Sequence, residues 1–186
     1  MSKFVKLANN IFLFLELPIN IDAVLLELKK VDWTFWGRNN NDPNQKIGEI
    51  ASIKNNTFLL KEIGSIAGTC FEEYFKYKNI ENNLYYFFVE SIYFRKWHFP
   101  MQGMSAHTDY TFDQSGNRKK VDFTMLGYLN DDYRGGLLEF PEYGISIKPP
   151  AGSVIIFSAD ELHAVTDLIE GHRIMWSTFI YRKNPS

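Results

Sequence analysis

The chain has 186 residues, enough for one domain with a buried core, and 45% of them are hydrophobic, which is an ordinary globular balance. Twenty basic and 22 acidic residues give a net charge of -2, and no basic stripe is present, so we expect no nucleic-acid partner. The single cysteine excludes an intrachain disulfide framework, and no apolar run reaches the ~18 residues of a membrane span. Because no cleavable signal is recognised either, we expect one cytoplasmic domain over residues 1–186 with no membrane partner.

Residues 1–80 are predicted to be mostly helical. Apolar residues recur at helical spacing over residues 21–36, where Asp22 gives the first turn an acidic side chain. The same spacing returns over residues 57–77. Between them, the sequence NNNDPNQK at 39–46 is typical of a surface turn. We therefore expect two amphipathic helices that support the rest of the chain.

From residue 82 onward the chain is rich in β-branched and aromatic residues without helical phase. Turn sequences rich in Gly, Pro and Asp separate the apolar runs. The predicted strands lie at 121–129, 137–140, 144–148, 153–158, 163–168 and 173–182. Helices followed by short strands indicate an α+β, mainly β fold, in which residues 81–186 form a sandwich or jelly roll with the helices on its outside.

The sequence SAHTDYT at 105–111 places a histidine and an aspartate on one face of a strand, with Thr108 on the other. Alone, this pair also fits an aspartate that orients a partly buried histidine. A second histidine, His163, follows on a later strand, so that His107, Asp109 and His163 supply two imidazoles and one carboxylate. This set leaves open coordination positions, as in non-haem Fe(II) oxygenases, whereas Mg²⁺ and Ca²⁺ favour oxygen ligands and structural zinc usually takes cysteine.

An arginine follows the second histidine by ten residues, on an apolar strand. Arg173 can grip a carboxylate through two parallel hydrogen bonds, and Ser177, on the same strand face, can add a hydroxyl donor. The alternative is a surface cation near the end of a strand. An inward-facing arginine among apolar neighbours needs an anionic partner.

These motifs together resemble the 2-oxoglutarate/Fe(II)-dependent dioxygenase superfamily, in its prolyl 4-hydroxylase-like branch. That branch typically has Tyr-Leu-Asn, a loop, Gly-Gly, a short strand and a Pro-Gly turn. Here Tyr-Leu-Asn stands at 128–130, Gly-Gly at 135–136 and the turn glycine at 152, and the match covers roughly residues 85 to 182. The distance from His163 to Arg173 differs from that of the nucleic-acid demethylase branch. The resemblance implies a double-stranded β-helix of the cupin-like kind.

Carried over by resemblance, His107, Asp109 and His163 would bind Fe(II), and Arg173 would hold the distal carboxylate of 2-oxoglutarate. Tyr128 and Ser177 would assist Arg173. The family often has a tyrosine about ten residues before the His-x-Asp motif, lining the co-substrate pocket. Trp97 stands there instead; its indole N–H can donate one bond, and Tyr93 is a candidate to compensate for the missing tyrosine. No catalytic residue beyond the metal ligands is expected.

The implied activity is hydroxylation with O2 and 2-oxoglutarate as co-substrates, release of succinate and CO2, and ascorbate as a further candidate cofactor. The implied substrate is a prolyl or other amino-acid side chain in a peptide or protein. One alternative is a hydroxylase of a free amino acid or small metabolite. Another is a non-catalytic, cupin-like metabolite-binding module, against which Arg173 argues because such a module does not need it. The sequence makes no prediction of oligomeric state.

The remaining expectations concern one loop and four polar residues. The loop at 110–120 is a candidate to close over the substrate. His98, placed in a loop, and His172, facing away from the neighbouring arginine, are expected to be surface groups. Asp160 and Glu161 are expected to be solvated, although either is close enough in sequence to orient His163.

Overall fold

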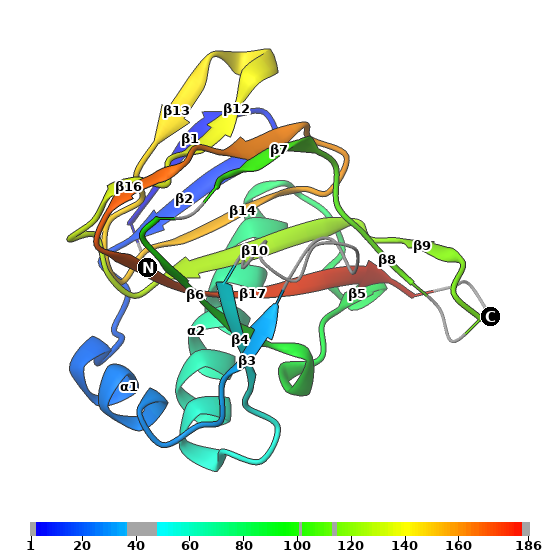
Figure 1. Ribbon diagram of the computed structural model, residues 1–186. Helices are drawn as coiled ribbons and strands as arrows, with labels where there is room; N and C mark the ends of the chain where they lie inside the picture. Colours follow the sequence, from blue (N-terminus) through cyan, green and yellow to red (C-terminus); the bar gives the residue numbers. More distant parts are fainter. Residues whose placement is uncertain (1–2, 37–47, 101, 113–114, 184–186) are drawn as a thin grey trace.

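Two β-sheets face each other in the computed structural model, and two helices cover the outer side of the larger sheet (Figure 1). The structure describes residues 3–36, 48–100, 102–112 and 115–183, so the predicted turn at 39–46 lies outside the described residues. The larger sheet has the order β1-β2-β14-β10-β17-β6-β4-β3, with β5 paired to β17, and the smaller sheet has the order β13-β12-β15-β7. This arrangement confirms the predicted α+β, mainly β jelly roll with helices on its outside.

The larger sheet consists of β1 (Lys3–Ala8), β2 (Ile11–Leu15), β3 (Thr34–Trp36), β4 (Gly48–Ser52), β5 (Tyr85–Tyr86), β6 (Tyr93–His98), β10 (Phe123–Tyr128), β14 (Val154–Ser158) and β17 (His172–Arg182). The smaller sheet consists of β7 (Met104–His107), β12 (Leu138–Phe140), β13 (Ile145–Ile147) and β15 (His163–Val165). Two further pairs are β8 (Tyr110–Phe112) with β9 (Arg118–Lys120), and β11 (Arg134–Gly135) with β16 (Leu168–Glu170). The helices are α1 (Ile21–Leu28), α2 (Thr57–Tyr77) and the short 3-10 turns η1 (Asn82–Leu84), η2 (Val89–Ser91) and η3 (Pro141–Tyr143).

Both helices begin at an asparagine whose side chain accepts a hydrogen bond from the first helical turn: Asn20 for α1 and Asn56 for α2. Helix α2 has the predicted bounds, whereas α1 ends at Leu28 and not at residue 36. The chain leaves the helix because residues 34–36 pair with β4, and the Trp33 indole donates to the Leu28 carbonyl at 3.1 Å. None of the helices in the described part of the chain has the length and apolar character needed to traverse a bilayer.

The first strands, β1 and β2, lie where the sequence predicted helical support. They form a hairpin whose second strand pairs with β14 and so extends the larger sheet. In β2, Phe12 and Phe14 pack toward the helices, while Ile11 belongs to the core between the sheets. This period-two alternation suits a strand that is buried on both faces. The N-terminal region therefore adds to the roll as well as supporting it.

Two apolar cores lie on the two sides of the larger sheet. The outer core, between that sheet and the helices, contains Phe94, Trp176 and Ile180, which are at most 1% exposed. The inner core, between the two sheets, includes Phe140 and Phe157. Gly127 permits the outer packing, because a Cβ there would lie 2.0 Å from the Trp176 ring.

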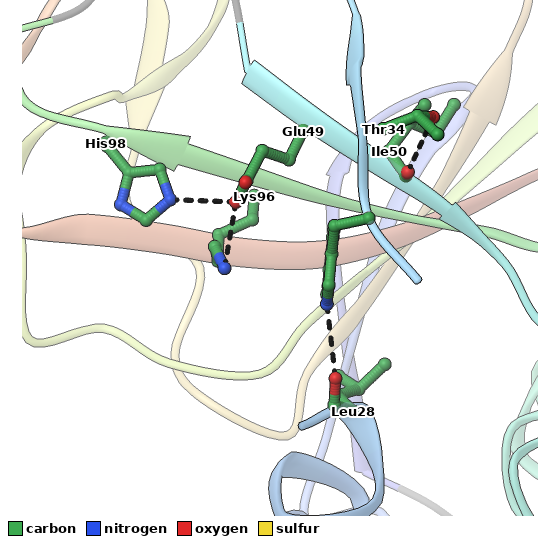
Figure 2. Close-up of polar contacts among 7 residues, drawn as sticks. Leu28, Thr34, Glu49, Ile50, Lys96 and His98 are labelled. Atoms are coloured by element: carbon green, nitrogen blue, oxygen red, sulfur yellow. Dashed lines mark hydrogen bonds and ion pairs between the residues drawn. The ribbon is translucent and has the colours of Figure 1, made fainter. Parts of the chain in front are cut away.

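The outer face of β6 carries a small polar cluster near the helices (Figure 2). Glu49 Oε2 accepts from Lys96 Nζ at 2.9 Å and lies 3.0 Å from His98 Nε2. His98 therefore ends strand β6 rather than lying in a loop, and it pairs with His172 of β17 across the sheet. His172 is exposed, as predicted. Because side chains alternate along a strand, Lys96 and His98 point away from the roll while their neighbours point into it.

Candidate metal centre and carboxylate pocket

A cavity of about 360 Å³ lies between the two sheets. His107, Asp109 and His163 line one side of it, from β7, from the residues after β7, and from β15. Arg173 and Ser177, both on β17, line the opposite side. The fold therefore brings together the residues that the sequence predicted to bind metal and those predicted to bind a carboxylate.

The three predicted metal ligands form a compact cluster. His107 and His163 are cross-strand partners in β7 and β15, and their ring centroids lie 4.4 Å apart. The carboxylate of Asp109 reaches both rings, with Oδ1 at 3.8 Å from His107 Nε2 and Oδ2 at 3.6 Å from His163 Nε2. One ligand atom from each residue lies within 4.8 Å of the other two. This spacing suits one shared divalent cation.

Both imidazoles are oriented by backbone carbonyls. His107 Nδ1 lies 2.8 Å from the Ser105 carbonyl oxygen, and His163 Nδ1 lies 3.0 Å from that of Glu161. A carbonyl oxygen only accepts, so each Nδ1 carries the proton and donates it. Each Nε2 is then left with its lone pair, which is the form of imidazole that binds a metal.

Two contacts hold Asp109 in place although the residue lies beyond the end of β7. Its backbone N–H donates to the Ala159 carbonyl at 2.9 Å, and Thr124 Oγ1 donates to its Oδ2 at 2.6 Å. Thr124 lies on β10 and is only 2% exposed. Thr124 was not predicted from the sequence, because it is 15 residues from Asp109 and no local pattern links the two.

The chemistry of this donor set fits Fe(II). Two neutral imidazoles and one carboxylate on one side of a cavity leave the facing coordination positions open, as in the two-histidine, one-carboxylate sites of Fe(II) oxygenases. No other group of three or more potential ligands of this kind is found in the described part of the chain. The only cysteine, Cys70, is buried in the outer core, which also argues against a structural zinc site.

Arg173 is buried among apolar and aromatic side chains. It is 2% exposed, and its guanidinium carbon lies 4.6 Å from the centre of the Trp97 ring. Nη1 donates to the Gly136 carbonyl at 3.2 Å and Nη2 lies 3.0 Å from Met175 Sδ, while Nε has no hydrogen-bond partner. No carboxylate within ion-pair distance of Arg173 is found among the described residues. A buried guanidinium without an anion is costly, so this is the place for an anionic ligand.

Two tyrosine hydroxyls near Arg173 are also buried without a hydrogen-bond partner. They belong to Tyr128, on β10, and to Tyr133, in the loop that follows. Burial raises the pKa of both phenols, while the charge of Arg173 lowers it. Both therefore remain protonated donors at neutral pH. The two hydroxyls and the Nε–H of Arg173 are thus three donors without an acceptor. Such a set suits the distal carboxylate of 2-oxoglutarate. Tyr128 was expected from the sequence at this place, whereas Tyr133 was not.

The two other predicted co-substrate residues also line the cavity. Trp97 lies beneath Arg173 and is 6% exposed, and Ser177 is also 6% exposed. Trp97 thus occupies the place that the resemblance reserves for a tyrosine. Tyr93 is 39% exposed and is not among the described residues that line this cavity, so it does not compensate there.

Asn130 fixes the backbone on either side of Arg173. Its Nδ2 donates to the His172 carbonyl at 2.7 Å, and its Oδ1 accepts from the Ile174 backbone N–H at 2.7 Å. The Tyr-Leu-Asn sequence is therefore linked to Arg173 by geometry. The Tyr128 ring centre lies 5.5 Å from the guanidinium carbon, and Asn130 holds the strand that presents the arginine.

A second arginine, Arg95, lines the cavity from β6 and was not identified from the sequence. Burial lowers its pKa to about 10, the charge of Asp109 raises it, and that of Arg173 lowers it. The guanidinium is therefore charged at neutral pH. The available sequence signal was its position two residues before Trp97, which places both side chains on the same strand face.

The predicted loop at 110–120 is a β-hairpin, β8–β9, apart from residues 113–114, which lie outside the described residues. Its first strand lines the cavity, with Tyr110 and Phe112 at the rim.

Lys120 of β9 pairs with Asp160, which is exposed as expected. The expectation for Glu161 is wrong: it is 7% exposed, and its carboxylate accepts from Tyr143 and Asn10. A buried carboxylate is satisfied only by such donors.

Comparison with known proteins agrees with this geometry. Residues 94–181 match the 2OG-Fe(II) oxygenase superfamily. A PKHD-type hydroxylase of Prochlorococcus marinus (strain MIT 9313) is 34% identical over 76 residues, which cover 40% of this chain and 34% of that protein. The matched stretch thus spans about a third of the length of this relative. All three candidate metal ligands and Arg173 lie within residues 94–181.

Two solved structures share the fold at low sequence identity. The viral collagen prolyl hydroxylase of Paramecium Bursaria Chlorella virus-1, in its 2OG complex, superimposes with a TM-score of 0.57 and 19% identity, covering 88% of this chain and 89% of that chain. The prolyl hydroxylase of Trichoplax adhaerens, in complex with a peptide fragment of hypoxia inducible factor, has a TM-score of 0.59 and 16% identity, covering 86% and 74%. Both support the predicted jelly roll.

Proposed function

We propose that this chain, whose residues 94–181 match the 2OG-Fe(II) oxygenase superfamily, is a hydroxylase acting on a prolyl or other amino-acid side chain in a peptide or protein. When bound, Fe(II) together with 2-oxoglutarate and O2 supplies the chemistry that inserts one oxygen atom into a C–H bond, with release of succinate and CO2. His107, Asp109 and His163 would hold the metal. Arg173 would hold the co-substrate.

The single observation that carries this proposal is the buried, anion-free guanidinium of Arg173 in the same cavity as the metal cluster. A roll that only binds a metal does not require a buried arginine. A non-catalytic metabolite-binding module is therefore less consistent with this cavity than an oxygenase that must place a dicarboxylate between the metal and a remote cation.

The side chains divide the work of binding and orientation. Carbonyl oxygens keep the protons of both imidazoles on Nδ1, so that the Nε2 lone pairs face the metal position. Thr124 fixes the Asp109 carboxylate by donating to Oδ2. Arg173, with Tyr128 and Tyr133, offers donors for the distal carboxylate of 2-oxoglutarate. Trp97 closes one side of this pocket with an apolar ring and keeps water from the guanidinium.

The rim of the cavity supports a peptide substrate. Tyr110 and Phe112 project from the β8–β9 hairpin as exposed aromatic side chains beside the opening, and their rings contact at 5.4 Å. Exposed rings next to a reactive centre are suited to hold an extended chain or a prolyl ring. The two prolyl hydroxylases that share the fold agree with this choice.

A substrate screen tests the proposal. The purified protein with Fe(II) and 2-oxoglutarate is incubated in air with a panel of proline-containing peptides and, separately, with free amino acids, while succinate is measured. We expect succinate to form in proportion to a product that has gained one oxygen atom, with peptides preferred. Product only from free amino acids would favour a small-molecule hydroxylase, and no succinate from a folded, metal-loaded protein under any condition would contradict the proposal.

A further inference from the structure

The turn at 158–161, where β14 ends, holds two of the three candidate metal ligands through its backbone carbonyls. The Ala159 carbonyl accepts from the Asp109 backbone N–H at 2.9 Å. The Glu161 carbonyl oxygen lies 3.0 Å from His163 Nδ1 and so keeps the imidazole proton on that nitrogen. A shift of this turn would therefore displace a carboxylate and an imidazole together. The geometry of the metal ligands depends on what holds the turn.

The side chain of Glu161 anchors this turn from two directions. Oε1 accepts from Asn10 Nδ2 at 3.0 Å, and Oε2 accepts from the Tyr143 hydroxyl at 2.8 Å. Asn10 lies in the turn between β1 and β2, at the edge of the larger sheet, whereas Tyr143 lies in η3, between two strands of the smaller sheet. Because Glu161 is only 7% exposed, water competes little for these hydrogen bonds. The buried carboxylate thus links the two sheets.

Asn10 is in turn held from helix α2. Lys78, which follows the last residue of that helix, donates from Nζ to Asn10 Oδ1 at 3.1 Å and to the Asn9 carbonyl at 3.0 Å. Since the amide oxygen of Asn10 accepts from this ammonium group, its amide nitrogen is the atom that faces Glu161. One series of hydrogen bonds therefore connects the outer helix, the first hairpin and the turn beside the metal ligands.

We propose that Glu161 is a positioning residue of the metal centre, whose buried carboxylate anchors the turn that holds Asp109 and His163. This role rests on the proposed function, because it requires that the three ligands bind a metal. Positioning is favoured because one residue supplies both the anchored carboxylate and the carbonyl that accepts from His163 Nδ1. The alternative is a carboxylate that serves only the stability of the fold, and the experiment separates the two.

The experiment compares Glu161→Leu, Glu161→Gln and Tyr143→Phe with a matched control, Glu139→Leu. Glu139 lies on β12 opposite Ala164 of β15 and accepts from Ser146, so the control removes a carboxylate from the same sheet without touching the turn. Glutamine keeps the shape of the side chain and one acceptor. Tyr143 is 43% exposed, so Tyr143→Phe removes one donor to Glu161 at little risk to folding.

Two properties of each variant are measured beside its thermal stability. In the metal-free protein at mildly alkaline pH, two-bond proton–nitrogen NMR spectra of the imidazoles show which nitrogen of His163 carries the proton. The signals of His163 are assigned by their absence in His163→Ala. Calorimetry then measures the Kd of Mn(II), which reports on the metal ligands without turnover.

We expect His163 of wild type to be protonated at Nδ1 alone, because the Glu161 carbonyl accepts that proton. Glu161→Leu should give a mixture of the two tautomers and weaken Mn(II) binding by about tenfold. Tyr143→Phe should weaken it by about threefold, and Glu161→Gln should weaken it less than Glu161→Leu does. Glu139→Leu should change neither the tautomer nor the Kd of Mn(II), whatever its effect on stability.

The positioning role is overturned if folded Glu161→Leu keeps the wild-type affinity for Mn(II), or if Glu139→Leu weakens it equally. Weaker binding with His163 still protonated at Nδ1 alone supports the role through Asp109, the other ligand that the turn holds. If Glu161→Leu does not fold, Tyr143→Phe decides, and an unchanged affinity rejects the role.

Failure of the proposed function has a different signature, since wild type itself would then bind no Mn(II). In that case the tautomer of His163 in the metal-free protein is the deciding measurement. A mixture of tautomers in Glu161→Leu, absent from Glu139→Leu, would still support the positioning of His163 by Glu161, and the wild-type tautomer in folded Glu161→Leu would reject it.

Discussion

The two faces of strands β6 and β17 differ in what they contact. The outer face presents Phe94, Trp176 and Ile180 to the helices, and these side chains are almost completely buried. The inner face of the same two strands presents Arg95 and Arg173 to a cavity. Because side chains alternate along a strand, neighbouring residues such as Phe94 and Arg95 point to opposite faces. The apolar side chains buried on the outer face stabilise the fold. This stability offsets the cost of burying charged side chains on the inner face when no ligand is bound there.

The largest expected effect on stability comes from the outer face. Trp176→Ala removes a fully buried indole that lies over Gly127, and we expect it to lower the free energy of unfolding by about 3–5 kcal/mol. Chemical denaturation measures this loss. At a temperature where the variant is folded, its affinity for Mn(II) should remain close to that of wild type; loss of metal binding in folded protein would show that the two faces are not separable.

The inner face is expected to respond in the opposite way. Arg173→Met removes a buried charge and keeps a side chain of similar length, so stability should be unchanged or higher. The affinity for 2-oxoglutarate should fall by roughly 30-fold or more, which corresponds to about 2 kcal/mol. Calorimetry with Mn(II)-loaded protein measures the dicarboxylate, and a separate titration measures the metal. Equal losses of metal and 2-oxoglutarate affinity would contradict the role of Arg173.

A smaller effect is expected for the hydroxyl that fixes Asp109. Thr124→Val removes the 2.6 Å hydrogen bond to Oδ2 with little change in shape, and we expect metal affinity to fall by about 10- to 100-fold. The matched control is Thr178→Val on β17, because the Thr178 hydroxyl is buried without a hydrogen-bond partner. This control should leave metal affinity unchanged and stability equal or higher. A similar loss of metal affinity in both variants would argue against the positioning role of Thr124.

The smallest effect belongs to the polar cluster on the outer side of β6. Hydrogen bonds from Lys96 and His98 hold the pKa of Glu49 below its ordinary value, despite its partial burial. This stabilisation is complete above the ordinary carboxyl pKa and is lost as the pH falls through the lowered value. Glu49→Gln should therefore cost about 0.2–1 kcal/mol at neutral pH and almost nothing in acid. Urea denaturation at both pH values tests this, and an equal cost in acid would contradict the assignment.

The three residues that form the candidate metal cluster were identified from the sequence because their signals are local or strongly patterned. His107 and Asp109 form one short motif, and His163 and Arg173 lie ten residues apart in two successive apolar strand patterns. Helix α2 was predicted with its bounds because its apolar spacing persists over five turns and it begins at a capping Asn56.

Other features depend on contacts between distant segments and left no local signal. Strand β2 belongs to the roll only because it pairs with β14, some 140 residues later in the chain. The contact of Thr124 with Asp109 joins strand β10 to the residues that follow β7, and the inward direction of Arg95 depends on the register of β6 with β17. Glu161 was expected in solvent because no local pattern shows its hydrogen-bond donors. These are Asn10, which is 151 residues away, and Tyr143, which is 18 residues away.

An anaerobic absorption spectrum tests most directly whether the inner face binds Fe(II) and 2-oxoglutarate together. Addition of both to the wild-type protein should produce the visible charge-transfer band of 2-oxoglutarate chelated to Fe(II). His107→Ala should abolish this band. The separate variant Arg173→Met should show the band only at a higher 2-oxoglutarate concentration than wild type needs. A folded wild-type protein that gives no band at saturating Fe(II) and 2-oxoglutarate would contradict the account.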